Sequence, residues 1–337
     1  MTLKALRVAV GVLQDAFGRV FLCRRPPGGH LAGLWEFPGG KLEPGETLEA
    51  GLARELSEEL GIRVFASEPL IRLPYHYPDR SVVLEVHRIL DYEGTPHGRE
   101  GQPCGWHRIE DLVLDELPPA DAPILAAIQL PPTYVITGED PGQPEAFLAR
   151  LDATLARGTR LVQLRAHGLD DPAYQTLASA ALTCCRRYGA RLLLNRDREA
   201  VRTVGADGQH LTHRRLWTLS ERPLPRTLWV GASCHNAADL EKARSLGLDY
   251  ALLSPVLPTA SHPEASPLGW DDFARLVATA GLPVYALGGM TPEDIDIARH
   301  HGGQGIATLR AGWSNTPLTP TNLPALPEGA EERGDNY

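Results

Sequence analysis

The sequence predicts two domains, an α+β domain over residues 1–130 and a (β/α)8 barrel over residues 131–313. Three observations lead to this prediction. The chain has 337 residues, which is longer than most single domains. Its first part mixes alternating strands with one strong amphipathic helix, whereas its second part repeats short apolar strands and helices. Pro131 and Pro132 separate the two patterns, and we place the boundary there.

The first domain contains both strand and helix signals. A helix is predicted over Thr47–Leu60 and a shorter one over Pro123–Ile128. Three segments alternate between apolar and polar residues as half-buried strands do, namely ALRVAVGVL, VFLCRR and SVVLEVHRIL. This mixture is typical of an α+β domain.

The second domain repeats one strand and one helix in units of about 20 to 25 residues. Helices such as EAFLARLDATLARG and NAADLEKARSLG separate most of the strands. The eight predicted strands are TYVITG, RLVQLRA, RLLLNRD, GQHLT, LWVGASCH, YALLSPV, PVYALGGM and GIATLRA. An open doubly wound sheet is the alternative, but such compact units favour a small barrel. Residues 314–337 lack periodicity and are predicted to be disordered.

Composition limits the classes of partner. The net charge is −9 and the arginines are scattered, so the composition does not predict binding to duplex nucleic acid. The sequence has no apolar run near the ~20 residues that span a bilayer and no signal-peptide pattern. The five cysteines form no CxxC pair and no zinc spacing. We therefore expect a cytoplasmic protein with reduced thiols and a small-molecule substrate.

Carboxylates crowd one end of the first predicted helix. Glu55, Glu58 and Glu59 fall at i, i+3 and i+4, so one helix face carries all three. Like charges at this spacing repel by roughly 0.2–0.5 kcal/mol per pair. The face therefore needs either full solvation or a bound cation, and the residue types alone leave both interpretations open.

The spacing of residues around this helix decides between them. Gly40 is followed after five residues by Glu46, and after seven more by RELSEELGI, residues Arg54–Ile62. The segment thus resembles the Nudix box, GX5EX7REUXEEXGU, at every specified position, and Gly61 can end the helix. The resemblance implies the Nudix fold, a mixed sheet between helices. It also implies hydrolysis of a nucleoside diphosphate derivative with Mg²⁺, or alternatively Mn²⁺, as the cofactor.

Residues 1–130 resemble the MutT-type Nudix hydrolases in particular. The shared segments are RVAVGVL, CRRP, HLAGLWEFPGGK, YPDR, and REGQPCGW followed by LPPADAP. This resemblance implies cleavage of 8-oxo-dGTP to the monophosphate and pyrophosphate. Such a reaction removes oxidised purine nucleotides before DNA replication can incorporate them.

The same resemblance assigns site residues. Gly39, through its carbonyl, would bind the metal together with Glu55, Glu58 and Glu59, and Glu100 would be a further ligand or base. Glu55 is the first choice for the general base. The residues expected to contact the nucleotide are Arg25, His30, Glu36, Phe37, Pro38, Gly39, Arg80 and Asp121.

Asp121 departs from the MutT pattern, which has an asparagine reading the oxidised purine at this position. An asparagine donates and accepts hydrogen bonds, whereas an ionised aspartate only accepts. Asp121 would therefore repel the purine O6 unless it is protonated, and burial can raise its pKa enough for that.

Polar residues and glycines follow the predicted barrel strands at their C-terminal ends, where barrel enzymes build their sites. They are Gln163, Arg165, Asn195, His210, Cys234, His235, Gly288 and Gly289. The two glycines, with the backbone amides of Leu309, Arg310 and Ala311, predict a phosphate-binding cradle.

Residues 133–313 resemble the thiamine-phosphate synthase and TenI family through QLR, GADGQHL, GASCHN, YALLSPVLPTASH and ALGGMTPEDI. The synthases need acidic magnesium ligands and a lysine. Here Arg196 stands where an aspartate is expected, and HRR at 213–215 replaces an acidic segment. His167 and His262 stand where lysines are usual. Arginines reverse the charge of a magnesium site, so we do not expect synthase activity.

Several functions stay open for the barrel. TenI-type thiazole tautomerases need no metal and use a histidine that matches His235 as acid and base. The barrel could instead bind a thiamine-pathway phosphate and regulate the hydrolase, or serve as a scaffold. A further alternative joins the halves, with the first domain hydrolysing a thiamine-related diphosphate.

Overall fold

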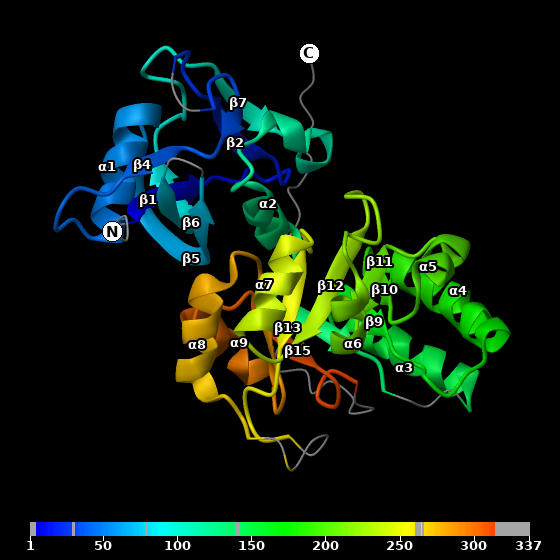
Figure 1. Ribbon diagram of the computed structural model, residues 1–337. Helices are drawn as coiled ribbons and strands as arrows, with labels where there is room; N and C mark the ends of the chain where they lie inside the picture. Colours follow the sequence, from blue (N-terminus) through cyan, green and yellow to red (C-terminus); the bar gives the residue numbers. More distant parts are fainter. Residues whose placement is uncertain are drawn as a thin grey trace, which may run out of the picture.

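The structure is a computed structural model that describes residues 5–28, 31–77, 80–138, 142–259, 264 and 266–313. Figure 1 shows a smaller N-terminal body, in blue and cyan, seated on one end of a larger barrel. His30, His262 and the tail 314–337 lie outside the described residues.

Two sheets form the N-terminal domain. In the larger sheet, with strand order β4-β1-β6-β5, β1 (Leu6–Val12) runs parallel to β6 and antiparallel to β4. The smaller sheet has the order β3-β2-β7. The other strands are β2 (Val20–Arg24), β3 (Trp35–Glu36), β4 (Gly39–Lys41), β5 (Arg63–His76), β6 (Ser81–Glu93) and β7 (Cys104–His107). The predicted mixed sheet is confirmed.

Helices cover both faces of the larger sheet. Ala9 packs in a cluster with α1 (Leu48–Leu60), whereas Val10 packs in a cluster with α2 (Ala122–Gln129). Successive side chains of a strand point to opposite faces, so β1 serves both cores. Two short 3-10 helices, η1 (Ile109–Asp111) and η2 (Leu114–Glu116), precede α2.

Helix α1 has the limits that its sequence signals predict. The Thr47 hydroxyl accepts a hydrogen bond from the Ala50 amide at 3.3 Å and caps the start. Gly61 ends the helix with a φ of 70°, a conformation that favours glycine. Leu56 and Leu60 are buried against the sheet. The opposite face is left for the carboxylates.

The C-terminal domain is a closed barrel of eight parallel strands, as predicted. Its strands are β8 (Thr133–Ile136), β9 (Leu161–Leu164), β10 (Arg191–Leu194), β11 (Gly208–Leu211), β12 (Trp229–Cys234), β13 (Tyr250–Leu253), β14 (Val284–Leu287) and β15 (Gly305–Thr308). Its helices are α3 (Pro144–Ala156), α4 (Asp171–Arg187), α5 (Arg198–Val204), α6 (His213–Thr218), α7 (Ala237–Ser245), α8 (Gly269–Ala280), η3 (Pro292–Asp294) and α9 (Ile295–His300).

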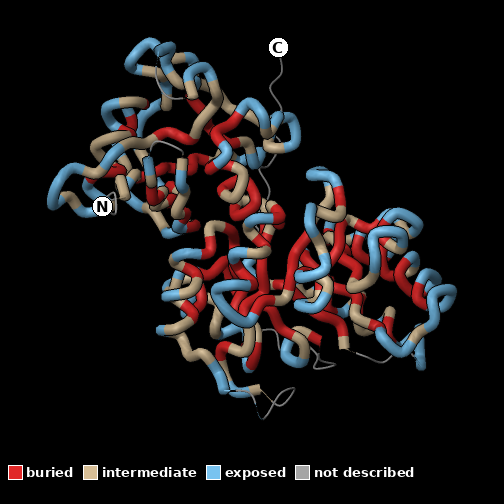
Figure 2. The backbone as a smooth tube through the Cα atoms, viewed as in Figure 1, coloured by how far each residue is buried: buried red, intermediate tan, exposed pale blue. Residues whose placement is uncertain are grey.

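Three tyrosines fill the barrel interior. Tyr134, Tyr250 and Tyr285 are fully buried, and each ring centroid lies 5.4–5.8 Å from the other two. Their hydroxyls find partners: Tyr250 donates to Tyr134 at 3.1 Å, and Tyr285 donates to the Pro131 carbonyl at 2.6 Å. Figure 2 shows that buried residues run through the barrel strands. The interior is therefore a packed core rather than a channel.

The expectation of five reduced cysteines is wrong for two of them. Cys23 and Cys104 form a disulfide, because β2 and β7 pair in a register that places them directly opposite each other. Cys184, Cys185 and Cys234 are free and buried. The pairing joins residues 81 positions apart, so no local spacing in the sequence indicates it.

The N-terminal domain docks on the N-terminal end of the barrel strands. Arg72 of β5 donates to the Ala278 carbonyl of α8 at 2.8 Å. The side-chain amide of Gln304 donates to the carbonyls of Ala127 and Leu130, at 3.0 and 2.9 Å. These bonds fix the end of α2 and the chain that follows it against the barrel. No helix within the described ranges is long and apolar enough to cross a membrane.

Candidate active site

Strand β4 brings two glycines against helix α1. The Gly39 amide donates to Oε2 of Glu59 at 3.0 Å. Gly39 has a φ of 141°, and a Cβ there would lie 2.1 Å from the Ala9 carbonyl oxygen, so only glycine fits. A Cβ on Gly40 would lie 2.2 Å from a carboxylate oxygen of Glu55. The glycines thus let the backbone contact two carboxylates of the predicted acidic face.

Arg54 holds three glutamates of the same region. Its guanidinium donates to Glu55 at 2.9 Å and to Glu58 at 3.2 Å. It also donates twice to Glu46, at 3.0 Å each, and these bonds are the main cause that lowers the pKa of Glu46 to about 2. Glu46 in turn accepts from the Glu43 amide at 2.9 Å and so fixes the loop before α1.

Glu59 lies where negative charge is most concentrated. Its pKa is raised to about 7, mainly by burial and in addition by the charges of Glu36, Glu55 and Glu100, against the opposing effect of the hydrogen bond from the Gly39 amide. Four carboxylates therefore act on one another at this end of α1. A cation among them would relieve the repulsion.

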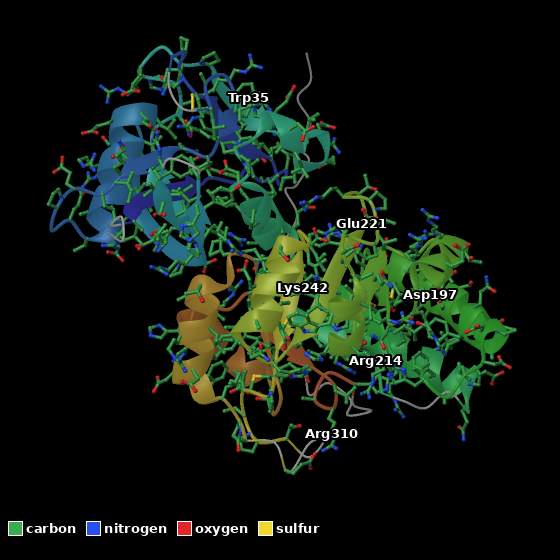
Figure 3. The ribbon with its side chains drawn as sticks, in the orientation of Figure 1. Trp35, Asp197, Arg214, Glu221, Lys242 and Arg310 are labelled. Carbon is green, nitrogen blue, oxygen red and sulfur yellow. A yellow bond between two sulfur atoms is a disulfide. The ribbon has the colours of Figure 1, made fainter. Side chains whose placement is uncertain are left out.

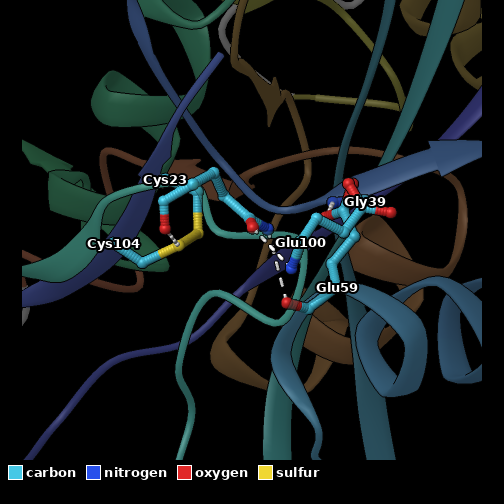
Figure 4. The surroundings of a disulfide bond; sticks show 6 residues. Cys23, Gly39, Glu59, Glu100 and Cys104 are labelled. Atoms are coloured by element: carbon cyan, nitrogen blue, oxygen red, sulfur yellow. Dashed lines mark hydrogen bonds between the residues drawn. A yellow bond between two sulfur atoms is a disulfide. The ribbon is translucent and has the colours of Figure 1, made fainter. Parts of the chain in front are cut away.

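The Glu100 loop is attached to the end of α1. The Arg99 amide donates to the Glu59 carbonyl at 2.9 Å, and the Glu100 amide donates to the Gln102 side chain at 2.8 Å. Figure 4 shows this loop beside Gly39 and Glu59, with the Cys23–Cys104 disulfide at its base. The disulfide thus anchors the chain that carries a predicted metal ligand.

The donors suit a hard divalent cation. Carboxylates and the Gly39 carbonyl are the oxygen ligands that Mg²⁺ and Mn²⁺ take. As these side chains stand, no three acidic, histidine or cysteine residues in the described part of the chain form a complete metal site. Glu55 and Glu58 are engaged by Arg54, and the Glu58 side chain is 59% exposed. Binding a cation would therefore require these side chains to turn away from Arg54.

A second group of predicted residues lies on β3 and on the loops outside α1. Arg25 forms an ion pair with Glu36, and Phe37 is buried. Arg80 is exposed at the turn between β5 and β6, where its carbonyl accepts from the Tyr77 amide at 2.8 Å. Pro38 follows Phe37 and accepts from the Gly11 amide at 2.8 Å.

Asp121 occupies an unusual position. It is the N-cap residue of α2, yet its side chain makes no capping hydrogen bond. The side chain is buried instead, and its Oδ2 has no partner in the structure. Burial raises its pKa to about 8, with a further contribution from Glu36, so the carboxyl is mostly protonated at neutral pH.

Tyr77 was missed by the sequence interpretation. Burial and the charge of the nearby Asp121 raise the pKa of Tyr77 to about 12, so the two side chains are close enough to interact. The segment YHYPDR contains it, but a single tyrosine in a predicted turn carries no signal of its own.

The mouth of the barrel holds a second polar cluster. His210 hydrogen-bonds Ser233 at 2.9 Å through Nε2 and faces Tyr134 at 3.4 Å through Nδ1. Burial lowers the pKa of His210 to about 3, so this ring is neutral. Asn195 donates to the His210 carbonyl at 3.1 Å. These groups form a fixed polar floor beneath the mouth.

His235 stands at the rim of this mouth and is exposed. Its Nδ1 lies 2.9 Å from the Ser254 carbonyl, which can only accept, so Nδ1 donates this hydrogen bond. The buried Asp239 accepts from the His235 amide at 2.8 Å and from His213 at 3.1 Å. Ser254 and Asp239 were not among the predicted residues because each supports His235 from a neighbouring element.

The other predicted barrel residues divide between the mouth and the surrounding layer. Gln163 is buried and its Oε1 has no partner, while the Arg165 amide is held by Thr137 at 2.9 Å. Cys234 does not face the mouth as expected, since it packs in the core between strands and helices. Arg310 is exposed at the end of the barrel away from the N-terminal domain (Figure 3).

Gly288 and Gly289 have positive φ values of 101° and 71°. A Cβ at either would lie 2.8–2.9 Å from the segment after β13, which passes close to them.

Arg196 does not present its charge where the synthases have an acid. Its guanidinium donates to the carbonyls of Ala166 and Leu169 at 3.3 and 2.8 Å, and lies 4.4 Å from the Tyr174 ring centroid. The side chain therefore secures the loop after β9.

Known proteins resemble the two halves separately. Residues 9–127 match the family model described as NUDIX domain. The 8-oxo-dGTP diphosphatase of Escherichia coli is 39% identical over 127 residues, 38% of this chain and 98% of that protein. The CTP pyrophosphohydrolase of the same organism is 35% identical over 125 residues, 37% of this chain and 92% of that protein.

Residues 133–311 match the family model described as thiamine monophosphate synthase. The putative thiamine-phosphate synthase 2 of Aquifex aeolicus is 35% identical over 182 residues, 54% of this chain and 97% of that protein. The chain therefore belongs to the thiamine monophosphate synthase family through its barrel, and its N-terminal domain is a Nudix hydrolase, an enzyme of phosphorus-containing anhydrides.

Proposed function

We propose that the N-terminal domain is a Mg²⁺-dependent nucleoside triphosphate pyrophosphohydrolase that cleaves 8-oxo-dGTP to 8-oxo-dGMP and pyrophosphate. The observation that carries this proposal is the concentration of carboxylates around Gly39 and Gly40, where burial and the neighbouring negative charges raise the pKa of Glu59 to about 7. An 8-oxo-dGTP diphosphatase is among the relatives, and so is a CTP pyrophosphohydrolase. The relatives thus differ in the nucleobase of their substrate, so our choice of 8-oxoguanine rests on the residues around Asp121 and not on similarity.

The proposed metal ligands are the Gly39 carbonyl, Glu55, Glu58, Glu59 and Glu100. When bound, the cation neutralises phosphate charge and makes a water molecule more acidic. Glu55 accepts the proton of the attacking water, because its carboxylate already lies against the Gly40 backbone. Arg54, which now holds Glu55 and Glu58, keeps the acidic face ordered until substrate binds.

We propose that Asp121 recognises the nucleobase of the substrate. A protonated carboxyl donates one hydrogen bond and accepts others, as the asparagine of MutT-type enzymes does. Asp121 in this form can donate to the purine O6 and accept from a ring N–H of 8-oxoguanine. Tyr77 and the Arg25–Glu36 pair lie close enough to Asp121 to interact with its charge, and the buried Phe37 follows Glu36 in the chain.

Steady-state kinetics of the full chain tests this function. We expect kcat/KM for 8-oxo-dGTP to exceed the values for dGTP, dATP and CTP in the presence of Mg²⁺. Equal, slow turnover of all four would contradict the sanitising role. Preferential turnover of a thiamine-related diphosphate would instead support the function that joins the two halves.

For the barrel we propose a metal-independent role in place of synthase activity, with His235 as a general acid and base of the TenI type. Two observations favour it: His235 is exposed at the mouth with its Nδ1 donating to the Ser254 carbonyl, and Arg196 replaces an expected magnesium ligand. Gln163, Arg165, Asn195, Gly288, Gly289 and Arg310 would hold the ligand and its phosphate group.

A His235→Ala variant tests the barrel role, with the exposed His300→Ala as control. We expect the first to lose tautomerisation of the thiazole carboxylate phosphate and the second to keep it. Phosphate binding by wild type without turnover would support a regulatory module. No activity and no stabilisation by any thiamine-pathway phosphate would leave a scaffold.

A further inference from the structure

A cavity of 330 Å³ lies where the two domains meet. Arg88 of β6 contributes from the N-terminal domain, and Arg160, Arg191 and Arg299 contribute from the barrel. The rest of the lining comes from the end of α2, the connecting chain and the end of α4, namely Ile128, Gln129, Leu130, Pro131, Pro132 and Gly189. The cavity is thus at the opposite end of the barrel strands from the mouth.

The lining of this cavity carries four guanidinium groups and no carboxylate. Two acids lie near it without lining it: Glu68 is 4.0 Å from Arg88, and Asp207 raises the pKa of Arg191 through its charge. Four positive charges are therefore opposed by two negative charges outside the cavity. Such an excess repels itself unless an anion joins it.

Interactions with the protein leave much of this hydrogen-bonding capacity unused. Nε of Arg88 is buried and has no partner in the structure. Arg191 makes two long bonds of 3.4 Å to Gln129, and Arg160 donates to the carbonyls of Leu155 and Thr159. Each guanidinium has five donor hydrogens, so these bonds orient the arginines and leave donors free for a ligand.

The arginines of the cavity influence one another's pKa values. Burial lowers the pKa of Arg88, and the charge of Arg299 lowers it further. Burial also lowers the pKa of Arg191, whose guanidinium lies 4.6 Å from the Trp229 ring centroid. The Trp229 ring therefore covers one face of Arg191, which leaves the edge of the guanidinium to donate hydrogen bonds.

We propose that this junction cavity binds a small phosphate anion of the pyrophosphate class, held by Arg88 from one domain and by Arg160, Arg191 and Arg299 from the other. Guanidinium groups match phosphate oxygens in a bidentate manner. The volume lies near the lower limit of about 300 Å³ for ligand pockets, which suits a small anion rather than a whole nucleotide.

Such a ligand bridges the two domains. Its charge replaces the repulsion between Arg88 and Arg299 with attraction to both, so it stabilises their junction. The proposal does not require the N-terminal domain to act on 8-oxo-dGTP. If that domain does release pyrophosphate, the junction can respond to the product of the reaction.

Thermal unfolding and calorimetry of the full chain with sodium pyrophosphate test the proposal. EDTA is present to prevent metal-dependent binding at the carboxylates, and sodium chloride is adjusted to equal ionic strength. We expect a saturable rise in Tm with wild type and at least about tenfold weaker binding with the Arg88→Gln/Arg299→Gln double variant, since bonds between charged groups are lost. Orthophosphate should bind more weakly than pyrophosphate.

Two control variants locate the site. Arg202→Gln, on the exposed surface of α5, should bind pyrophosphate as wild type does. Arg310→Gln, at the barrel mouth that is proposed above to hold a phosphate group, separates binding at the mouth from binding at the junction. Loss of binding in Arg310→Gln with retention in the double variant would overturn the proposal, because it would place the anion at the mouth. No saturable binding to wild type, or a Tm rise that chloride reproduces, would also overturn it.

The variants should fold, because removing like charges relieves repulsion. Nucleotide hydrolysis by the double variant checks this, since neither arginine belongs to the proposed catalytic residues. If the double variant does not fold, Arg299→Gln alone provides the measurement, and unchanged affinity in that variant would overturn the proposal.

Discussion

The two candidate sites treat charge in opposite ways. At the end of α1, burial and the charges of Glu36, Glu55 and Glu100 raise the pKa of Glu59. At the barrel mouth, Arg196 and His213, which were expected to replace acids of the synthases, are each engaged by neighbouring protein groups. The first site has unbalanced negative charge that favours a cation. In the second, the protein itself satisfies the substituted groups.

The two sites also differ in what their charged groups contact. The glycines and glutamates of the Nudix box fit each other so closely that a Cβ on Gly40 would touch Glu55. In the barrel, Arg196 serves the loop after β9, and Asp239 binds His213 and the His235 backbone. The charged and polar groups around the barrel mouth are therefore held by partners within the protein.

The largest effect should come from the acidic site. Glu55→Gln removes the proposed base and one metal ligand, so we expect kcat/KM for nucleotide hydrolysis to fall about 10³-fold. The matched control is Glu49→Gln, an exposed glutamate in the first turn of the same helix. Pyrophosphate release measures both. Activity within about threefold of wild type in Glu55→Gln would remove this residue from the mechanism.

Reduction of the disulfide should lower the stability of the N-terminal domain and leave that of the barrel unchanged. Cys23–Cys104 closes a loop of 81 residues within the N-terminal domain, so reduction should lower its free energy of unfolding by about 2–4 kcal/mol. The barrel has only buried thiols and should not respond. Hydrogen exchange of peptides from each domain, with and without dithiothreitol, measures the difference.

The Cys23→Ser/Cys104→Ser double variant is the control for this measurement. It should exchange like the reduced protein and be insensitive to dithiothreitol. Faster exchange confined to barrel peptides on reduction would show that the disulfide does not have the proposed effect.

A smaller effect concerns pH and base selection. Burial and the charge of Glu36 raise the pKa of Asp121 to about 8, whereas the charge of Arg25 opposes this rise. Tyr77 is also close enough to interact with Asp121. Its carboxyl donates below this pH and loses its proton above it, so selectivity for 8-oxo-dGTP over dGTP should fall about tenfold as pH rises from 7 to 9.5. Because the folded-state pKa exceeds the unfolded value, the protonated carboxyl also contributes stability that is lost as pH rises from about 4 to 8.

Asp121→Asn checks the cause of this pH effect. An asparagine does not titrate, so the ratio of kcat/KM values should become flat between pH 7 and 9.5. A ratio that keeps its fall in the variant would assign the pH dependence to another group.

Local signals predicted most of the fold. Thr47 and Gly61 mark the two ends of α1, because helix caps depend on residues that are adjacent in sequence. The barrel strands recur with a regular period. Strand β5 was missed because Pro69 and Pro74 interrupt its pattern, and a strand at the edge of a sheet tolerates them. Strand β7 is only four residues long and offers too short a pattern to recognise.

The site was predicted where spacing alone defines it. The box residues needed only the sequence, whereas the Cys23–Cys104 pairing depends on the register of two distant strands. The burial of Asp121 likewise depends on how α2 packs against the sheet. The sequence shows that Asp121 must be protonated to avoid repelling the purine O6. Only the packing shows that the side chain is buried, which is the cause of its raised pKa.

The way the domains dock determines how a small molecule could pass between their candidate sites. The barrel uses the N-terminal end of its strands to seat the hydrolase, so its mouth opens at the far end (Figure 1). A molecule leaving one site reaches the other through bulk solvent, without channelling. The fusion then supplies the two domains in fixed one-to-one stoichiometry, and the junction is where they contact each other.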